Sequence, residues 1–201
     1  SCMTGRRLSL GWALLLVTAL GSVEACSSLP RIVILHDPLT PQEHVTLGES
    51  YQAGGRGDLA AREFEAALRR QAEFVPALIG LGNLAYETNA FEESEEFYRR
   101  VLAAVPDHPG ASNNLALVYL ARGARLDEAE GLARRAAEQG GALRPYALDT
   151  LAQIYIRQGR YREAQSALEE AAAMAPAENM RIHQGLSRSR HELRSLYAPH
   201  D

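Results

Sequence analysis

A dipeptide of leucine followed by glycine or alanine recurs along this chain at an almost constant interval. The first three copies lie 34 residues apart and the fourth follows after 36; they are Leu47-Gly48, Leu81-Gly82, Leu115-Ala116 and Leu151-Ala152. A period of this length is typical of arrays in which each copy forms one small unit of secondary structure. Because such a unit cannot bury its apolar face alone, it packs against the units before and after it. The repeat therefore predicts a stack of similar units.

Each copy contains two apolar stripes at helical spacing, separated by a turn. In the fourth copy, the first stripe runs through residues 148–155, with apolar side chains at i, i+3, i+4 and i+7. Gly159 then interrupts the pattern, since glycine adopts at little cost the positive φ that ends a helix. A second stripe begins at Tyr161, and Pro176 closes it. We therefore predict two helices per copy, over residues 41–54, 58–72, 76–88, 91–104, 109–122, 126–139, 145–158 and 161–174.

The residues around each dipeptide resemble the consensus of the tetratricopeptide repeat (TPR) family, W-x2-L-G-x2-Y followed by A-x3-F and Pro. An aromatic residue follows the dipeptide at the consensus spacing in three copies, as Tyr51, Tyr119 and Tyr155, and Ala85 replaces it in the other. The second helices carry the matching pairs Ala60 and Phe64, Ser94 and Tyr98, Ala129 and Ala133, and Ala164 and Leu168. The consensus tryptophan is absent; its positions hold His44, Leu78, Ser112 and Leu148.

This resemblance implies an all-α fold, a right-handed α-solenoid of about four TPR helix hairpins. The four repeats would occupy residues 40–176, divided at about 41–74, 75–108, 109–144 and 145–176. Residues 177–201 are expected to form a capping helix and tail. This last segment has only a partial apolar face, which suits a helix that covers the open end of a stack and stays soluble on its other side.

The composition favours a helical protein that does not bind nucleic acid. Hydrophobic residues make up 46% of the chain and aromatic residues only 6%, which is typical of cores built from alanine and leucine. All 21 basic residues are arginine, and they alternate with glutamates in a chain of net charge −4. Because the arginines do not gather into a basic stripe, we expect no nucleic-acid partner.

The N-terminal segment has the features of a secretory signal peptide, which we place at residues 1–25 with its start at Met3. Arg6-Arg7 precede an apolar run of 13 residues, from Leu8 to Leu20. A helix that spans a bilayer needs about 20 residues, so this run is too short for one. A basic start, a short apolar core and small residues at the end are the parts of a signal peptide.

The end of this leader, Val23-Glu24-Ala25-Cys26, resembles the lipobox of bacterial lipoproteins, from which it departs at Glu24. An ordinary signal peptidase site is the alternative, and both cleavages fall between Ala25 and Cys26. Cys26 would then be the only cysteine left, without a disulfide partner in an oxidising compartment. We therefore predict that Cys26 is the lipidation site and that a lipid anchor holds the chain at the membrane. Ser27 resembles the sorting signal of Gram-negative lipoproteins, which implies an outer-membrane protein facing the periplasm.

Residues 26–39 are expected to form the lipidated cysteine and an extended tether. Pro30 and Pro38 argue against a helix, and residues 31–35 form an apolar, β-branched run. Two interpretations stay open for this run. It packs as a strap across the first repeat, or it offers a docking strand to a partner.

No arrangement of residues predicts catalysis, and we expect neither an enzyme nor a cofactor. His183 and His191 lie eight residues apart without a close carboxylate or cysteine, so we expect no metal site there. The Gly54–Gly57 segment lacks the lysine and hydroxyl residue of a phosphate-binding loop. Function is therefore expected to reside on a surface.

The resemblance to the TPR family implies that the first helices of the repeats line a concave groove that binds a protein or peptide partner. Carried over through the repeat register, the groove positions are Val45, Glu49, Gln52, Ile79, Asn83, Tyr86, Glu87, Asn113, Leu117, Leu120, Tyr146, Asp149, Gln153, Ile156 and Arg157. Amides at such positions can bond an extended peptide backbone, and tyrosines offer flat apolar contacts. A cationic clamp for an acidic C-terminal peptide is not expected, because only Arg157 is basic.

These features together predict a non-catalytic scaffold that holds a partner protein beside the outer membrane. Within that class the chain resembles the pilotin-type lipoproteins that help assemble type IV pili or secretion pores. Lipoproteins of the outer-membrane assembly machinery and envelope-division factors belong to the same class. Two other hypotheses stay open: a soluble periplasmic peptide-binding chaperone, and an accessory subunit of a periplasmic enzyme.

Overall fold

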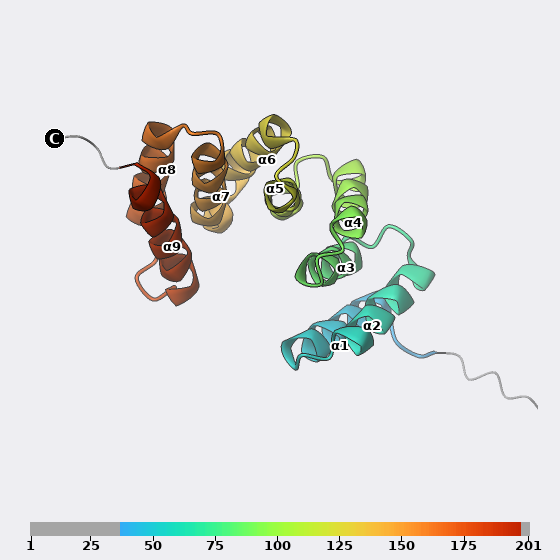
Figure 1. Cartoon of the computed structure of the whole chain (residues 1–201). Coiled ribbons are helices and arrows are strands. Elements are labelled where there is room, and N and C mark those ends of the chain that lie inside the picture. Colours follow the sequence, from blue (N-terminus) through green and yellow to red (C-terminus); the bar gives the residue numbers. More distant parts are fainter. Residues whose placement is uncertain (1–36, 198–201) are drawn as a thin grey trace, which may run out of the picture. The chain divides into compact units, whose positions relative to one another are not determined.

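The computed structural model describes residues 37–197, and the chain divides into a unit up to Pro38 and a second unit from Leu39 onward. The predicted leader, Cys26 and the predicted tether up to residue 36 lie outside the described residues. Every regular element of the described part is helical (Figure 1). The α-helices are α1 (Pro41–Ala53), α2 (Gly57–Arg70), α3 (Val75–Glu87), α4 (Phe91–Ala104), α5 (Pro109–Arg122), α6 (Leu126–Gln139), α7 (Arg144–Arg157), α8 (Tyr161–Met174) and α9 (Met180–Leu196). A short 3-10 helix, η1 (Gly141–Leu143), precedes α7.

The ends of the first eight helices agree with the sequence prediction to within two residues. The start of α1 has a capping box: the Thr40 hydroxyl accepts from the Glu43 amide, and the Glu43 carboxylate accepts from the Thr40 amide at 2.7 Å. The ninth helix starts at Met180, three residues later than expected. The reason is local, because the Asn179 side chain accepts from the Ile182 amide and caps the helix there.

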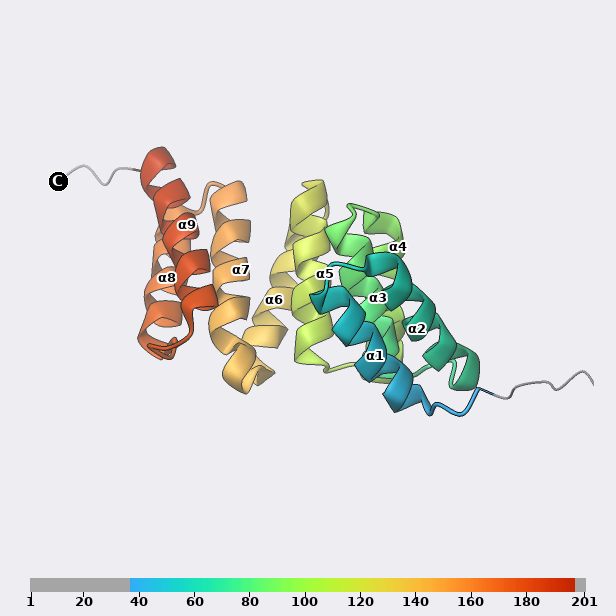
Figure 2. The same ribbon diagram turned by 90° about the horizontal axis from the view of Figure 1, so that it is seen from below.

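The helices stack as successive hairpins, each packed on the next. Odd-numbered helices contact one another in series, α1 with α3, α3 with α5, α5 with α7 and α7 with α9. Within the unit that begins at Leu39, they line one side of the stack and the even-numbered helices lie behind them (Figures 1 and 2). We call the surface of the odd-numbered helices the inner face. The fold is therefore an all-helical solenoid.

Aromatic rings in the core fill the space that glycines leave open. The buried ring of Phe64 on α2 lies between Gly48 on α1 and Gly80 on α3. A Cβ built on either glycine would come within 2.6 Å of that ring. Tyr98 packs over Gly82 in the same way, at 2.7 Å. The glycine of the repeated dipeptide is thus needed because a ring occupies the place of its side chain.

An arginine covers the tyrosine of the repeat at three of the four turns. The guanidinium carbon lies 4.3–4.7 Å from the ring centroid in the pairs Arg56–Tyr51, Arg125–Tyr119 and Arg160–Tyr155. Arg125 reaches its ring from a left-handed backbone conformation with φ of 56°. Its turn, residues 123–125, carries one of the two extra residues that lengthen this repeat from 34 to 36. The ion pairs of Arg125 with Glu95 and Glu128 stabilise its position.

Among residues 37–197, no helix is both long enough and apolar enough to cross a membrane.

Candidate functional site

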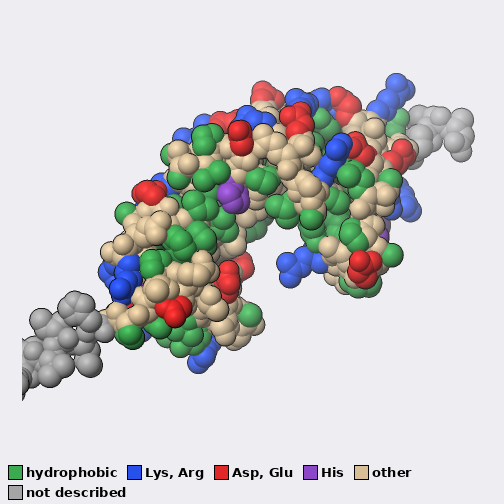
Figure 3. Space-filling view, turned by 180° about the vertical axis from the view of Figure 1, so that it is seen from behind, with side chains coloured by type: hydrophobic (Ala, Val, Ile, Leu, Met, Phe, Trp, Pro, Cys, Tyr) green, Lys and Arg blue, Asp and Glu red, His purple; other side chains and the backbone are tan. Residues whose placement is uncertain are grey.

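The inner face forms the hollowed side of the described unit (Figure 3). At its α1 end, Glu49 is exposed and Gln52 is half-buried. The Gln52 amide donates to the Glu87 carboxylate of α3 at 2.9 Å, so these two groove positions link neighbouring helices. Val45 belongs to the core instead, with 1% of its surface exposed. The first helices of the first two repeats therefore offer a polar surface of Glu49, Gln52 and Glu87.

A hydrogen-bond network occupies the next groove position, Asn83 on α3. Its side-chain oxygen accepts from the Tyr98 hydroxyl at 2.7 Å and from the Asn114 amide of α5 at 3.1 Å. Burial raises the pKa of Tyr98 to about 12, so this hydroxyl stays protonated and able to donate at neutral pH. Asn83 thus joins three helices, and its acceptor oxygen is already engaged.

The centre of the inner face contains Tyr86, Asn113 and Leu117, all half-buried. The Tyr86 ring packs edge-on against Phe91, with centroids 5.7 Å apart. The Asn113 oxygen is enclosed and has no hydrogen-bond partner among the described residues. An enclosed polar group without a partner is uncommon, because its desolvation costs about 1–3 kcal/mol. This cluster therefore combines apolar contact area with an amide that has bonding capacity left.

At the α7 end, α9 occupies much of the predicted groove. The Tyr146 hydroxyl exchanges hydrogen bonds with Asn179, just before α9. Asp149 is buried and accepts from Ser189 on α9 at 2.6 Å and from Gln153 at 3.1 Å. Tyr146 and Asp149 therefore contact the chain itself, whereas Arg157 is exposed. Of the other positions carried over from the family, Leu120 and Ile156 are buried and Ile79 is half-buried.

Replacing Asp149 by asparagine is expected to raise the stability of the fold at neutral pH, where α9 packs over this side chain. The substitution should bring no such gain in acid. Burial raises the pKa of Asp149 above its ordinary value of 3.8. The folded state thus binds a proton more tightly than the unfolded state. The carboxyl group therefore stabilises the fold below pH 3.8, and this contribution is lost as the pH rises through the raised pKa.

Thermal unfolding of the Asp149→Asn variant and the parent between pH 3 and 7 tests this expectation. The difference in Tm should favour the variant at pH 7 and shrink as the pH falls. A difference that is constant with pH would contradict it. Ser189→Ala is the matched control, since it removes the hydrogen bond to Asp149 and leaves the titrating group in place.

Two residues of this face escaped prediction from the sequence. Asn114 bridges α3 and α5, and Ser189 anchors α9 to α7. Asn114 directly follows a predicted groove residue, so the adjacent amides were a usable signal. Ser189 had no comparable signal, because its role depends on where α9 packs.

The polar groups of the inner face are amides, hydroxyls, carboxylates and the guanidinium of Arg157. No group of three or more His, Cys, Asp or Glu side chains within residues 37–197 is placed to hold a metal ion. Arginines with ion pairs lie mostly on other faces, such as the cluster around Glu95 formed by Arg99, Arg122 and Arg125.

Solved structures with the same architecture include several bacterial proteins. PilF of Pseudomonas aeruginosa has a TM-score of 0.62 at 18% identity, over 82% of this chain and 79% of that chain. PilW, a widely conserved type IV pilus biogenesis factor, has a TM-score of 0.65 at 17% identity, over 78% of this chain and 77% of that chain. MamA has a TM-score of 0.58 at 18% identity, over 75% of this chain and 90% of that chain. At these identities the likeness establishes the fold alone.

Curated relatives share a segment with this chain. The human protein O-mannosyl-transferase TMTC1 is 30% identical over 133 residues, which are 66% of this chain. The mitochondrial ALBINO3-like protein 3 of Arabidopsis thaliana is 30% identical over 87 residues, which are 43% of this chain. The chain spans only 15% of the length of either relative.

Family models cover the stacked helices almost completely. One model of the tetratricopeptide repeat matches residues 45–109 and 98–145, and a second matches residues 145–178. The matches cover the four hairpins expected from the recurring dipeptide. The chain belongs to the tetratricopeptide repeat family.

Proposed function

We propose that this protein is a non-catalytic scaffold that binds a segment of a partner protein along its inner face. The observation that carries the proposal is the group of half-buried side chains at the centre of that face, Tyr86, Asn113 and Leu117. The Asn113 oxygen is enclosed, but the NH₂ group at the other end of its amide can donate to a peptide carbonyl, and peptide side chains can pack on Tyr86 and Leu117.

The flanking residues favour a ligand that runs across several helices. Glu49 and Gln52 on the first repeat and Glu87 on the second offer polar groups at one end, and Gln153 and Arg157 on the fourth repeat offer them at the other. These sites lie on both sides of the central cluster along the series of odd-numbered helices. An extended segment meets both ends, whereas a small molecule would reach only one.

We further propose that the scaffold works at the bacterial cell envelope as an outer-membrane lipoprotein facing the periplasm. Cys26 would be the lipid attachment site and residues 26–39 the tether to the first repeat. The fold that the chain shares with PilW, a type IV pilus biogenesis factor, supports a pilotin-like role in assembling or localising an envelope complex. Because PilW and this chain are 17% identical, the proposal concerns the class of partner and not a particular partner protein.

Replacing Asn113 by leucine is expected to weaken partner binding by about 10-fold, the effect of losing roughly 1–1.5 kcal/mol of hydrogen bonding. The same change should leave the free energy of unfolding unchanged or raise it, because the enclosed oxygen bonds to no described residue. The variant should therefore bind the partner more weakly without a loss of stability.

A photo-reactive residue at position 117 measures binding in the native envelope, by mass spectrometry of the cross-linked partner. Cross-linking should fall in the Asn113→Leu background. The matched control carries the photo-reactive residue at Arg135, an exposed position of α6. If positions 117 and 135 capture the same proteins in equal yield, and Asn113→Leu changes neither, the inner face is not the binding surface.

A further inference from the structure

Helix α9 continues the repeat register of the four hairpins. Leu186-Ser187 lies 35 residues after Leu151-Ala152, close to the spacing of the earlier dipeptides, and again joins leucine to a small residue. α9 packs on α7 and α8, as α3 packs on α1 and α2. It therefore stands in the place of the first helix of a fifth hairpin.

In the first two hairpins, the small residue of the dipeptide faces the second helix of its own repeat. Gly48 lies under Phe64 of α2, and Gly82 lies under Tyr98 of α4. The Ser94 hydroxyl of α4 also donates to the Gly82 carbonyl at 2.8 Å. This position and its neighbours on the same helical face form a seat for the second helix. We call the corresponding surface of α9 the open seat.

The burial pattern of α9 shows that one of its two packing faces is uncovered. Ile182, Leu186 and Ser189 face the preceding hairpin and are at most 4% exposed. Ser187, by contrast, is exposed, and His183 and Arg190 are half-buried. Their equivalents in the second repeat, which α4 covers, are all buried: Leu78, Gly82 and Ala85. A hollow of about 240 Å³ marks the open seat, lined by His183, Leu186, Ser187, Arg190, His191 and Arg194.

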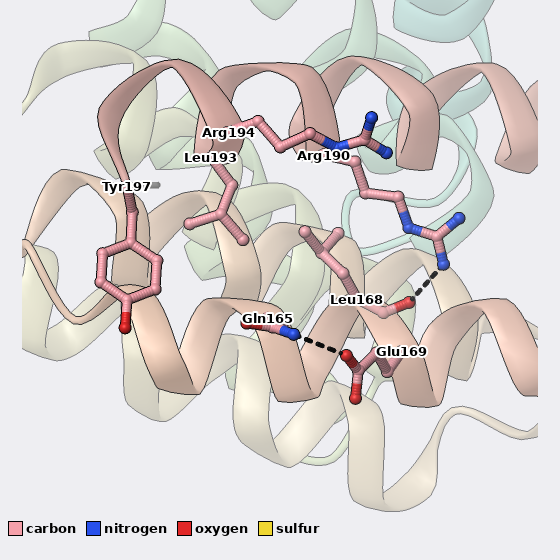
Figure 4. A pocket seen from close by; sticks show the side chains of 7 residues that line it. All are labelled: Gln165, Leu168, Glu169, Arg190, Leu193, Arg194 and Tyr197. Carbon is pink, nitrogen blue, oxygen red and sulfur yellow. Dashed lines mark hydrogen bonds between the residues drawn. The ribbon is translucent and has the colours of Figure 1, made fainter. Parts of the chain in front are cut away.

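The open seat is cationic on an otherwise acidic unit. α9 carries four arginines and one glutamate. None of these arginines forms an ion pair with a described carboxylate, whereas arginines on α4 to α8 form many. The side chains of Arg190 and Arg194 also border a second hollow of about 230 Å³ between α8 and α9 (Figure 4). Arg190 is held in place because it donates to the Leu168 carbonyl at 3.3 Å.

The second helices of this chain indicate what such a seat accepts. α4 runs back along α3, so that Phe91 at its start packs on Tyr86 near the end of α3. The first turn of α4 carries Glu92 and Glu93, and Tyr98 follows one to two turns later. In the repeat register, the first turn of a helix packed on α9 in this way would lie near Arg190 and Arg194. A side chain equivalent to Tyr98 would lie over Ser187, the position on α9 that corresponds to Gly82.

We propose that the open seat of α9 binds a helix from a partner protein, which completes a fifth repeat. This helix has acidic residues in its first turn, opposite Arg190 and Arg194. It has a large apolar side chain about six residues further on, over Ser187. Charge complementarity selects the partner, because the cationic seat repels the arginine-rich helices that an ordinary apolar seat would tolerate. The surface is separate from the inner face, so the protein could hold two partners or two parts of one.

A synthetic peptide with the sequence of residues 90–105, which contains α4, is a suitable probe. Fluorescence anisotropy of the labelled peptide, titrated with the full chain, measures binding. The same peptide with its four glutamates replaced by glutamine tests the charge requirement. We expect the acidic peptide to bind at least 10-fold more tightly than the neutral one at low ionic strength, and salt to reduce the difference.

Variants of the full chain locate the site. Arg190→Glu combined with Arg194→Glu should weaken binding of the acidic peptide by about 10-fold or more. Ser187→Glu should also weaken binding, because it places an acidic side chain in the seat, three residues before Arg190 on the same helix face. Ser187 is exposed, so this variant keeps the fold. The matched control is Arg135→Glu with Arg162→Glu, two exposed arginines elsewhere on the unit, which should leave binding unchanged.

Three results would overturn the proposal. Equal binding of the acidic and neutral peptides would remove the charge argument. No binding at millimolar peptide, with the parent folded by circular dichroism, would show that the polar face of α9 only keeps the end of the stack soluble. Vesicles of phosphatidylglycerol that bind in an Arg190-dependent manner, while the peptide does not bind, would assign the surface to a membrane instead.

Discussion

Replacing Phe64 by alanine is expected to lower the free energy of unfolding by about 3–5 kcal/mol, the largest loss of stability for a single change in this protein. The ring is completely buried and lies between helices of two repeats, against Gly48 and Gly80. Neither glycine has a side chain that can move into the space left by the ring. The cavity would therefore stay open, so we expect the loss in free energy of unfolding to lie near the upper end of this range.

The same contact predicts the effect of the reverse change. Gly80→Ala adds a Cβ within 2.6 Å of the Phe64 ring and should cost about 1–3 kcal/mol through overpacking. Combining it with Phe64→Leu should recover part of that loss, since the smaller side chain leaves room. Gly131→Ala is the matched control in α6, because a Cβ there meets nothing within 4 Å, and it should stabilise the helix by about 0.5–1 kcal/mol.

Urea unfolding followed by circular dichroism measures all four variants. The order of stability should be Gly131→Ala, parent, Gly80→Ala and then Phe64→Ala. If Gly80→Ala proved as stable as Gly131→Ala, the close packing of the ring between the glycines would be refuted.

Replacing Cys26 by serine is expected to move the protein almost completely from the membrane fraction to the soluble fraction. Removal of the leader, with Arg6, Arg7 and Glu24, leaves a net charge of −5, which gives no attraction to anionic headgroups. Acyl chains contribute about 0.8 kcal/mol per buried CH₂, so they would supply nearly all of the binding to the membrane.

Fractionation of the envelope with quantitative blotting tests the anchor, and intact mass of the mature protein tests the acylation directly. Cys2→Ser is the matched control and should leave the distribution unchanged, since Cys2 lies within the proposed leader. A Cys26→Ser protein that stays in the membrane fraction would refute the lipoprotein proposal. That result would leave the inner face and the open seat unaffected.

Much of the fold followed from the sequence because the repeat imposes its own register. The dipeptide lies at a fixed place in each repeat, Thr40 marks the start of α1, and a glycine with positive φ follows the first helix in three of the four repeats. These signals set helix ends to within two residues. These are local signals. A pattern repeated four times also averages out the ambiguity of any single copy.

The inner face was predicted less completely, for a reason of tertiary packing. The register identifies which side of a first helix points inward, but it does not say whether another helix covers that side. α9 covers Tyr146 and Asp149, and Tyr98 reaches Asn83 from the helix behind. Such contacts depend on where a helix docks, and single positions in the sequence carry no signal for that.

The second repeat is the one whose turn has no arginine over an aromatic ring, since Ala85 replaces the tyrosine. The buried core also divides beside this repeat, into a small cluster around Phe64 and a large one that extends from Leu78 to Leu193. A hollow of about 370 Å³ between α2, α3 and α4 lies at the same boundary. The small cluster includes Ala77 and Leu81 of α3, so it joins the first hairpin to the second. Stability in a stack depends mainly on contacts between neighbours, so we expect the first hairpin, which has a neighbour on one side and rests on the smaller cluster, to open before the larger cluster does. Amide hydrogens of α1 and α2 should therefore exchange with solvent through a local opening that leaves the last three hairpins folded.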